Sequence, residues 1–240
     1  MIKSISIQSP VDLLSKLDGR YNPVLYRGID DSTIPLIPGI GRMHDKLDYY
    51  EDWYGVENDL TETFEKYALP YLKSKPENKY EWLVLAQHHG VPTRLLDWTT
   101  NPLKALYYAV ENPKSKTDGV VWEYEPASWW DDLEGIDSHM SKYDVPIVSC
   151  HPAHLNERII AQESCFTYFA FPKSKEPIPP LDDMKHYKKE IRSLVKYVIP
   201  SVEKHECRIK LEKLGITHRS LFPDLDGVGI SIRRELSLEW

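Results

Sequence analysis

Polar residues of several kinds are concentrated in one short segment between two apolar flanks. The stretch LAQHHGVPTRLLDWTTNPLKALYYA, residues 85–109, holds paired histidines, an arginine, an aspartate and several threonines. Arginine can grip a phosphate or a carboxylate through two parallel hydrogen bonds, and a loop fixed between two helices presents such groups rigidly. The candidate binding residues in this segment are His88, His89, Thr93, Arg94, Asp97 and Thr99.

These residues also have a purely structural interpretation. Adjacent histidines project in different directions, so His88 and His89 are a poor pair of ligands for one metal ion. Either imidazole could instead hydrogen-bond a bound molecule. Arg94 and Asp97 could pair with each other and hold the loop, an alternative that we weigh equally with ligand binding.

A second group of candidates is the tripeptide Tyr26-Arg27-Gly28, which ends a predicted strand at 22–29. Arg27 could make a bidentate contact to phosphate or carboxylate. Gly28 has no side chain and would let a ligand approach the backbone. The competing interpretation is a structural salt bridge between Arg27 and an acidic neighbour.

A third group, Arg158, Gln162 and Glu163, precedes a predicted strand at 164–171 that is rich in aromatic and β-branched residues. A polar side chain at the start of a strand can point into a cleft. For Glu163 the alternative is a carboxylate that faces solvent, as most glutamates do.

Metal-binding motifs are weak. Cys150, His151 and His154 are zinc-type residues, but no second ligand pair has standard spacing, so we expect no metal and disfavour a metal-dependent hydrolase. His205 and Cys207 are expected to be packing residues of a helix. None of the motifs GxSxG, GxxxxGK[ST], HExxH or GxGxxG occurs, which argues against the commonest hydrolases and nucleotide-binding folds.

The candidates alternate with predicted helices and strands. Asn101 and Pro102 suit the N-cap and first position of a helix whose apolar residues recur at i, i+3, i+4 and i+7. Gly90 is placed to end the preceding helix. A short buried strand is compatible with TRLLDW, residues 93–98. The other predicted helices are 10–18, 81–89, 202–214, one or two within 44–68, one within 154–162 and one after Pro223, and the other predicted strands are 117–124, 145–150 and 194–200.

This order of elements indicates the class of fold. Helices and strands are interspersed without a regular βαβ rhythm, which favours an α+β fold, a small mixed sheet flanked by helices, over a doubly wound sheet. We find no linker, repeat or low-complexity tract. Residues 1–240 are therefore expected to form one domain, long enough to enclose a single core.

Composition narrows the function further. The 30 lysines and arginines and 37 acidic residues give a formal net charge of −7, which argues against nonspecific nucleic-acid binding. No apolar run approaches the roughly 20 residues of a membrane helix, and residues 1–14 lack the features of a signal peptide. Three cysteines without CxxC spacing indicate free thiols. We expect a cytoplasmic protein without membrane association.

Several of these segments together resemble the FRG domain, a family named after an aromatic-Arg-Gly motif. They are YRG at 26–28, residues 87–109, DGVVWEY at 118–124, RIIAQESCFT at 158–167, and GI followed by LFPDLDG at 215–227. The resemblance covers about residues 20–235 and implies a bacterial or phage protein in a setting of conflict or defence. One difference is local: FRG domains commonly have a glycine soon after the glutamine of the third motif, where this chain has Glu163-Ser164-Cys165.

The layout of these motifs is also similar to that of ADP-ribosyltransferases, which implies NAD as the substrate. By this resemblance Arg27 would hold the NAD phosphates. Thr93 or Thr99 would be the supporting hydroxyl. Gln162 or Glu163 would stand at the catalytic position, where a carboxylate lowers the barrier by stabilising positive charge on the ribose.

Two functions are thus expected. The first is an ADP-ribosyltransferase-like activity with an unknown macromolecular acceptor, in an intracellular toxin or phage-defence effector. The alternative is a non-catalytic sensor or recognition module that binds a nucleotide, a nucleic-acid end or a protein partner in the same cleft. A solvent-facing Glu163, with Gln162 alone in the cleft, would favour binding over catalysis.

Overall fold

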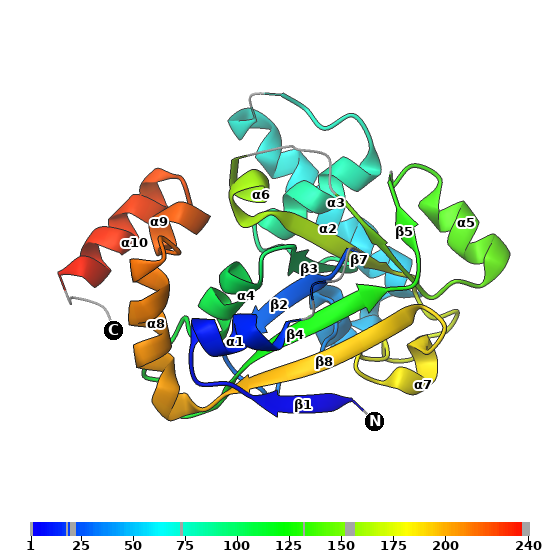
Figure 1. Cartoon of the computed structure of the whole chain (residues 1–240). Helices are drawn as coiled ribbons and strands as arrows, with labels where there is room; N and C mark the ends of the chain where they lie inside the picture. Colours follow the sequence, from blue (N-terminus) through cyan, green and yellow to red (C-terminus); the bar gives the residue numbers. More distant parts are fainter. Residues whose placement is uncertain are drawn as a thin grey trace.

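The computed structural model describes residues 2–236 except for 18, 20–22, 73, 132 and 152–156. In this part of the chain, eight strands form one curled sheet in the order β1-β8-β4-β2-β3-β7-β6-β5 (Figure 1). The strands are β1 (Lys3–Ser6), β2 (Leu25–Ile29), β3 (Leu95–Thr99), β4 (Gly119–Pro126), β5 (Trp129–Trp130), β6 (Ile147–Cys150), β7 (Ser164–Phe169) and β8 (Ile191–Ile199).

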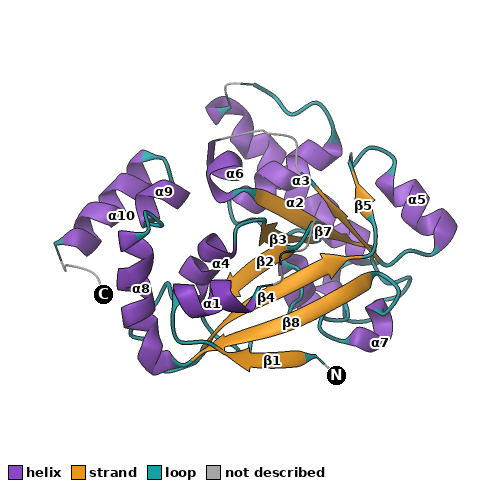
Figure 2. Cartoon of the chain, viewed as in Figure 1, coloured by secondary structure: helices purple, strands orange, loops and turns teal. Residues whose placement is uncertain are grey.

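Helices flank this sheet (Figure 2). The α-helices are α1 (Pro10–Lys16), α2 (Trp53–Ala68), α3 (Lys79–His88), α4 (Pro102–Ala109), α5 (Ile136–Tyr143), α6 (Glu157–Gln162), α7 (Met184–Tyr187), α8 (Lys204–Lys213), α9 (His218–Leu221) and α10 (Leu225–Glu235), and the 3-10 helices are η1 (Gly39–Tyr49), η2 (Leu69–Tyr71) and η3 (Ser201–Glu203). Helices α8, α9 and α10 gather at one end of the sheet, and α5 and α7 lie at the opposite end (Figure 1). No helix in the described ranges combines the length and hydropathy needed to cross a membrane.

The sheet is antiparallel except at its two edges, where β1 pairs with β8 and β5 with β6 in parallel. Alternate residues of a strand face opposite sides, so β4 contributes to two cores. Val120, Trp122 and Tyr124 join η1 and α2 in one hydrophobic cluster, whereas Val121 joins α1, α4 and α8 in another. The architecture is the predicted α+β class, a mixed sheet flanked by helices.

Two glycines bring α4 close to the strands beneath it. A Cβ atom at Gly28 would lie 1.7 Å from the main-chain oxygen of Ala105, and one at Gly119 would lie 2.1 Å from that of Ala109. Side chains at these positions would therefore push α4 away. The missing side chain of Gly28 therefore makes room for α4, and the Gly28 backbone also lines the cavity described below.

The join between β2 and β3 is the weak point of the sheet. These antiparallel strands share a single paired position, Tyr26 with Thr99. If the ladder continued in the same register, Arg27 would face Trp98 and Gly28 would face Asp97. The two strands separate there instead, and the sheet opens between a β1-β8-β4-β2 half and a β3-β7-β6-β5 half.

Most of the predicted elements are present. Asn101 caps α4 by accepting hydrogen bonds from the backbone N–H groups of Leu103 and Lys104, and Gly90 follows α3 with a positive φ of 79°. The segment TRLLDW contains β3. Strand β1 was not predicted, because KSIS offers a single apolar residue and owes its conformation to β8.

Candidate functional site

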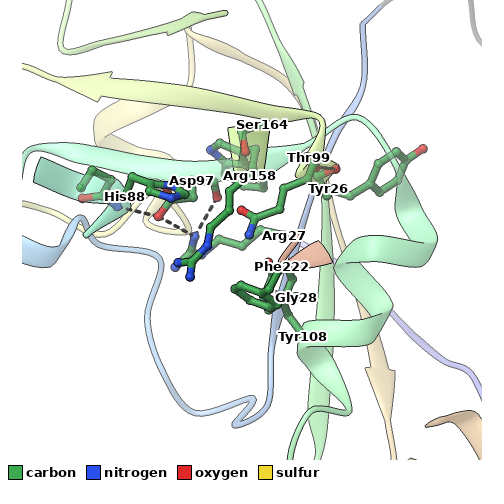
Figure 3. Close-up of a pocket in the computed structure, with 13 residues that line it drawn as sticks. Tyr26, Arg27, Gly28, His88, Asp97, Thr99, Tyr108, Arg158, Ser164 and Phe222 are labelled. Atoms are coloured by element: carbon green, nitrogen blue, oxygen red, sulfur yellow. Dashed lines mark hydrogen bonds and ion pairs between the residues drawn. The ribbon is translucent and has the colours of Figure 1, made fainter. Parts of the chain in front are cut away.

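A cavity of about 300 Å³ occupies the opening between β2 and β3 (Figure 3). This volume is at the lower end of the range for small-molecule sites. The lining residues come from both strands and from α3, α4, α6, β7 and the end of α9: Tyr26, Arg27, Gly28, Gln87, His88, Asp97, Trp98, Thr99, Tyr108, Arg158, Gln162, Ser164 and Phe222. Because the strands separate, residues that would have paired in a continuous ladder line the cavity instead.

Arg27 reaches from β2 towards β3. Its Nη1 donates a hydrogen bond of 2.7 Å to the main-chain oxygen of Asp97 and lies 3.7 Å from Oδ2 of the same residue. Its Nε is buried and has no hydrogen-bond partner in the described part of the chain. Burial lowers the pKa of Arg27, against the effect of Asp97. A buried donor without an acceptor costs free energy, so this guanidinium is suited to an anionic ligand.

A chain of hydrogen bonds orients Asp97. Gln87 Nε2 donates to Asp97 Oδ2 over 2.5 Å, and Thr93 Oγ1 donates to Gln87 Oε1 over 2.7 Å. The Asp97 side chain lines the cavity and is 48% exposed. The surrounding protein raises the pKa of Asp97 by desolvation, and the positive charge of Arg27 opposes this. Thr93 is buried outside the cavity and therefore positions Asp97 only through Gln87.

Thr99 and Gln162 line the cavity but are bonded to the protein. Thr99 Oγ1 donates to the main-chain oxygen of Gln162 over 2.7 Å and accepts from the N–H of Asn101 over 3.1 Å. Gln162 Nε2 donates to the main-chain oxygen of Leu221 over 3.2 Å. The Thr99 hydroxyl therefore holds the turn before β7, and Gln162 ties that turn to α9.

Arg158 forms a second cationic wall. Its Nε is hydrogen-bonded to the carboxylate of Asp224, and its guanidinium lies over the Phe222 ring, 5.4 Å from the centroid. Its two terminal nitrogens have no hydrogen-bond partner among the described residues. In Figure 3 the Arg27 and Arg158 guanidiniums lie near the centre, with Tyr108 and Phe222 to one side and Asp97 and His88 to the other. The cavity therefore combines two guanidiniums with aromatic rings.

The two histidines are placed differently. Burial, together with His89 and Arg158, lowers the pKa of His88 to about 4, so His88 lines the cavity as a neutral imidazole at pH 7. His89 is exposed, does not line the cavity, and stacks on Phe64 with 6.0 Å between ring centroids. Tyr26 contributes to the lining, but it is 8% exposed and its ring points away from the other labelled residues (Figure 3).

Arg94 is part of the core, not of the cavity. It is 2% exposed, its Nε donates to Glu57 Oε1 over 2.8 Å, and its Nη2 is hydrogen-bonded to Glu57 Oε2. The guanidinium also lies 3.6 Å from the centroid of the Phe171 ring. Against the cost of burial, the charge of Glu57 raises the pKa of Arg94. The alternative that Arg94 pairs with Asp97 is wrong: its acidic partners are Glu57 and Asp137.

Glu163 lies outside the cavity, on the turn between α6 and β7. Its carboxylate accepts hydrogen bonds from Lys104 Nζ at 2.6 Å and Thr100 Oγ1 at 3.1 Å, and its side chain is 44% exposed. Its backbone is in the left-handed region, with φ of 50°. Burial alone would raise the pKa of Glu163, but the Lys104 ammonium and the hydrogen bonds from Thr100 and Asn101 outweigh it and lower this pKa. Gln162 is therefore the residue of this pair that faces the cavity.

Sequence reasoning missed five lining residues: Gln87, Trp98, Tyr108, Ser164 and Phe222. Gln87 and Trp98 lie inside the segment singled out at the start, and Tyr108 lies near the end of the same stretch. Phe222 is more than one hundred residues away in the LFPDLDG segment, and the sequence did not single it out as a site residue, because only the fold brings α9 beside α6.

The cysteines are not arranged for chemistry. Burial raises the pKa of Cys150 and of Cys165 to about 12 and that of Cys207 to about 11. Cys165 Sγ lies 3.3 Å from His151 Nδ1. His154, which the sequence groups with Cys150 and His151, lies outside the described residues. Among the described residues, no group of three or more histidines, cysteines or acidic residues could hold a metal ion.

The structure thus combines an α+β fold with a cavity between two diverging strands. The family profile of the FRG domain matches residues 22–118 of the chain, a range that contains β2, α3, β3 and α4. The protein therefore contains an FRG domain. Neither the curated proteins nor the solved structures include a match to the chain. The matched range supplies the strands that diverge, whereas Arg158 and Phe222 lie beyond it.

Proposed function

We propose that the cavity binds a nucleotide-type ligand, with NAD as the candidate. The observation that carries this proposal is the pair of guanidiniums, Arg27 and Arg158, beside aromatic rings in one pocket. Arginine matches the geometry of phosphate oxygens, and aromatic side chains suit the planar base. The choice of NAD among nucleotides rests on the layout shared with ADP-ribosyltransferases.

The electrostatics of the cavity support an anionic ligand. The unpartnered Nε of Arg27 and the free terminal nitrogens of Arg158 are donors without protein acceptors in the described chain. Asp97 opposes them, but Gln87 and the main chain already engage it. His88 is neutral at pH 7, and the Glu163 carboxylate stays outside, held by Lys104. A phosphate would thus meet more donors than acceptors.

Binding is favoured over transfer by the position of Glu163. An oxocarbenium-like transition state needs a fixed negative charge close to the ribose. Glu163 is tied to Lys104 outside the cavity, and Gln162 carries no charge. We therefore place the non-catalytic recognition module first.

One observation keeps glycosyl transfer as the second candidate: the carboxylate of Asp97 does line the cavity. In this second candidate function, Asp97 would stabilise the positive charge on the ribose, the role that the resemblance to ADP-ribosyltransferases assigns to Gln162 or Glu163. The bond between nicotinamide and ribose would break, the bond electrons would leave with nicotinamide, and a macromolecular acceptor or water would attack the ribose. A cytoplasmic toxin or defence effector is the biological role that such NAD turnover would support.

The test of binding is calorimetric titration of NAD into the wild type and two variants. Arg27→Gln removes a charged donor in the cavity, and losing a hydrogen bond to a charged group costs about 1.5–3 kcal/mol, so binding should weaken at least about tenfold. Glu163→Gln is the matched control outside the cavity and should bind as the wild type does. Equal affinity in all three proteins would contradict the proposal.

The test of transfer is nicotinamide release from labelled NAD, with and without cell lysate. Turnover that Asp97→Asn abolishes and Glu163→Gln preserves would establish the second candidate. Binding without turnover in any mixture would leave the recognition module as the function. Turnover lost in Glu163→Gln and kept in Asp97→Asn would contradict the role that we give to Asp97.

A further inference from the structure

A second cavity, of about 210 Å³, lies among α8, α9 and α10, away from the opening between β2 and β3. The residues that line it are all of polar or charged type: Arg208, Glu212, Thr217, His218, Ser231, Arg234 and Glu235. None of these residues lines the first cavity. The C-terminal helices thus enclose a separate site whose side chains could bind a ligand.

The two arginines of this cavity meet at one buried hydroxyl. Arg208 Nη2 donates to Tyr107 Oη over 2.6 Å, and Arg234 Nη1 donates to the same oxygen over 2.7 Å. Arginine has no acceptor, so the Tyr107 hydroxyl gives its own proton to His218 Nδ1, at 2.9 Å. The Tyr107 oxygen is fully used, and the guanidiniums must find other acceptors for their remaining N–H groups.

The acceptors that Arg208 needs are missing from the protein. Arg208 is 1% exposed, and its Nε and Nη1 are buried without a hydrogen-bond partner in the described chain. The Glu212 carboxylate stops 3.5 Å from Nε, and its side chain is 41% exposed. Glu111 lies 3.6 Å from Arg234 Nη2, with 37% of its side chain exposed. Unsatisfied buried donors are rare in folded proteins, and here they belong to a cation that lines a cavity.

Neutral groups complete the site. Ser231 is buried and lines the cavity with its hydroxyl group. Burial, followed by the charges of Arg234 and Arg208, lowers the pKa of His218 to about 4, so it adds no third positive charge at pH 7. Glu212 and Glu235 supply the opposing negative charge, and both are exposed. An anion that displaces Glu212 into solvent would satisfy Arg208.

We infer that this second cavity binds an oxyanion, a phosphate or carboxylate group, between Arg208 and Arg234. Both groups offer the planar or tetrahedral oxygens that a guanidinium contacts in pairs. Without a bound anion, the Glu212 carboxylate lies beside Arg208, and it would compete with the anion for this position. The site stands independently of NAD binding, because its residues are separate from those of the first cavity.

The experiment is thermal unfolding with increasing inorganic phosphate or acetate, each against sodium chloride at equal ionic strength. We expect saturable stabilisation by at least one of these oxyanions, since a ligand of the folded state raises Tm by mass action. Arg234→Gln, a half-buried position that leaves Arg208 in place, should weaken the apparent affinity at least about tenfold. Glu212→Gln removes the competitor and should tighten it.

Arg27→Gln separates the two cavities, because it can remove only the response that comes from anions bound in the first cavity. The part of the response that Arg234→Gln weakens should persist in Arg27→Gln. Four results would each overturn the inference: no stabilisation beyond the chloride control, the same affinity in Arg234→Gln as in the wild type, weaker affinity in Glu212→Gln, or loss of this part of the response in Arg27→Gln. Circular dichroism of each variant before heating confirms that the compared proteins are folded.

Discussion

Arg27 and Arg94 both lie close to carboxylates, but the structure gives them different roles. Arg94 has its Nε and both terminal nitrogens hydrogen-bonded to Glu57 and Asp137. Arg27 keeps an unpartnered Nε and faces a cavity. A saturated, buried arginine fixes the core, whereas an unsaturated one can bind a ligand. The number of satisfied donors distinguishes two residues that look alike in sequence.

We predict that Glu57→Gln lowers the free energy of unfolding. Removing the Glu57 charge leaves the buried Arg94 with Asp137, at 3.4 Å, as its acidic partner among the described residues, and breaking a buried pair costs up to about 3–5 kcal/mol. The free energy of unfolding, measured by urea denaturation, should fall by about that amount. Glu62→Gln, at an exposed glutamate of the same helix, is the control and should change it by less than about 0.5 kcal/mol. A wild-type value for Glu57→Gln would contradict the structural role of this pair.

At the scale of elements, α4 sets the geometry of the site. It starts at the Asn101 cap directly after β3, and the contact at Gly28 fixes its distance from β2. Tyr108 projects from its last turn to line the cavity. On the other side, the hydrogen bond from Gln162 to Leu221 and the Arg158–Asp224 pair hold α9 and α10 against α6. The cavity is therefore formed by elements far apart in the chain.

Gly28→Ala tests the close approach of α4. The new Cβ would lie 1.7 Å from Ala105 O, so the helix or strand must shift. We expect Tm to drop by an amount that corresponds to at least about 1–3 kcal/mol, the usual cost of overpacking. Gly229→Ala in α10 is the matched control: its Cβ would meet nothing within 4 Å, and alanine in a helix should stabilise by about 0.5–1 kcal/mol. Equal effects of the two substitutions would contradict this account.

For the whole molecule, we expect the half-buried, neutral imidazole of His88 to make the free energy of unfolding depend on pH. Its pKa is lowered from 6.5 to about 4 in the folded protein. Between these values the unfolded chain binds a proton that the folded chain does not, so the free energy of unfolding falls as pH falls from about 6.5 towards 4. Above about pH 6.5 both forms are neutral, and His88 contributes no pH dependence.

His88→Asn should therefore show a shallower fall in stability than the wild type over this range. The measurement is urea unfolding at pH 7, 6, 5 and 4.5. His186→Asn, at an exposed position, is the control and should follow the wild-type curve. A His88→Asn curve parallel to the wild type would show that the His88 imidazole is protonated equally in the folded and unfolded states.

The sequence by itself determined the class of fold and most of its elements. Apolar spacing, the Asn101 cap and Gly90 act between near neighbours in the chain, so the local residues predict α3, β3 and α4. The sequence also identified the strand of Arg27 and the segment of Asp97 as places for chemistry. In contrast, KSIS forms β1 because β8 lies beside it, which no local pattern reveals.

Only the tertiary structure decided which candidates meet. Side chains such as Arg27, Asp97, Arg158 and Phe222 converge because β2 and β3 pair at one position and then separate. Glu163 and Gln162 are adjacent in sequence, yet the left-handed backbone at Glu163 directs it to Lys104 while Gln162 faces the cavity. Burial and pairing depend on contacts between distant segments, and these contacts assigned Arg94 to the core and Arg27 to the site.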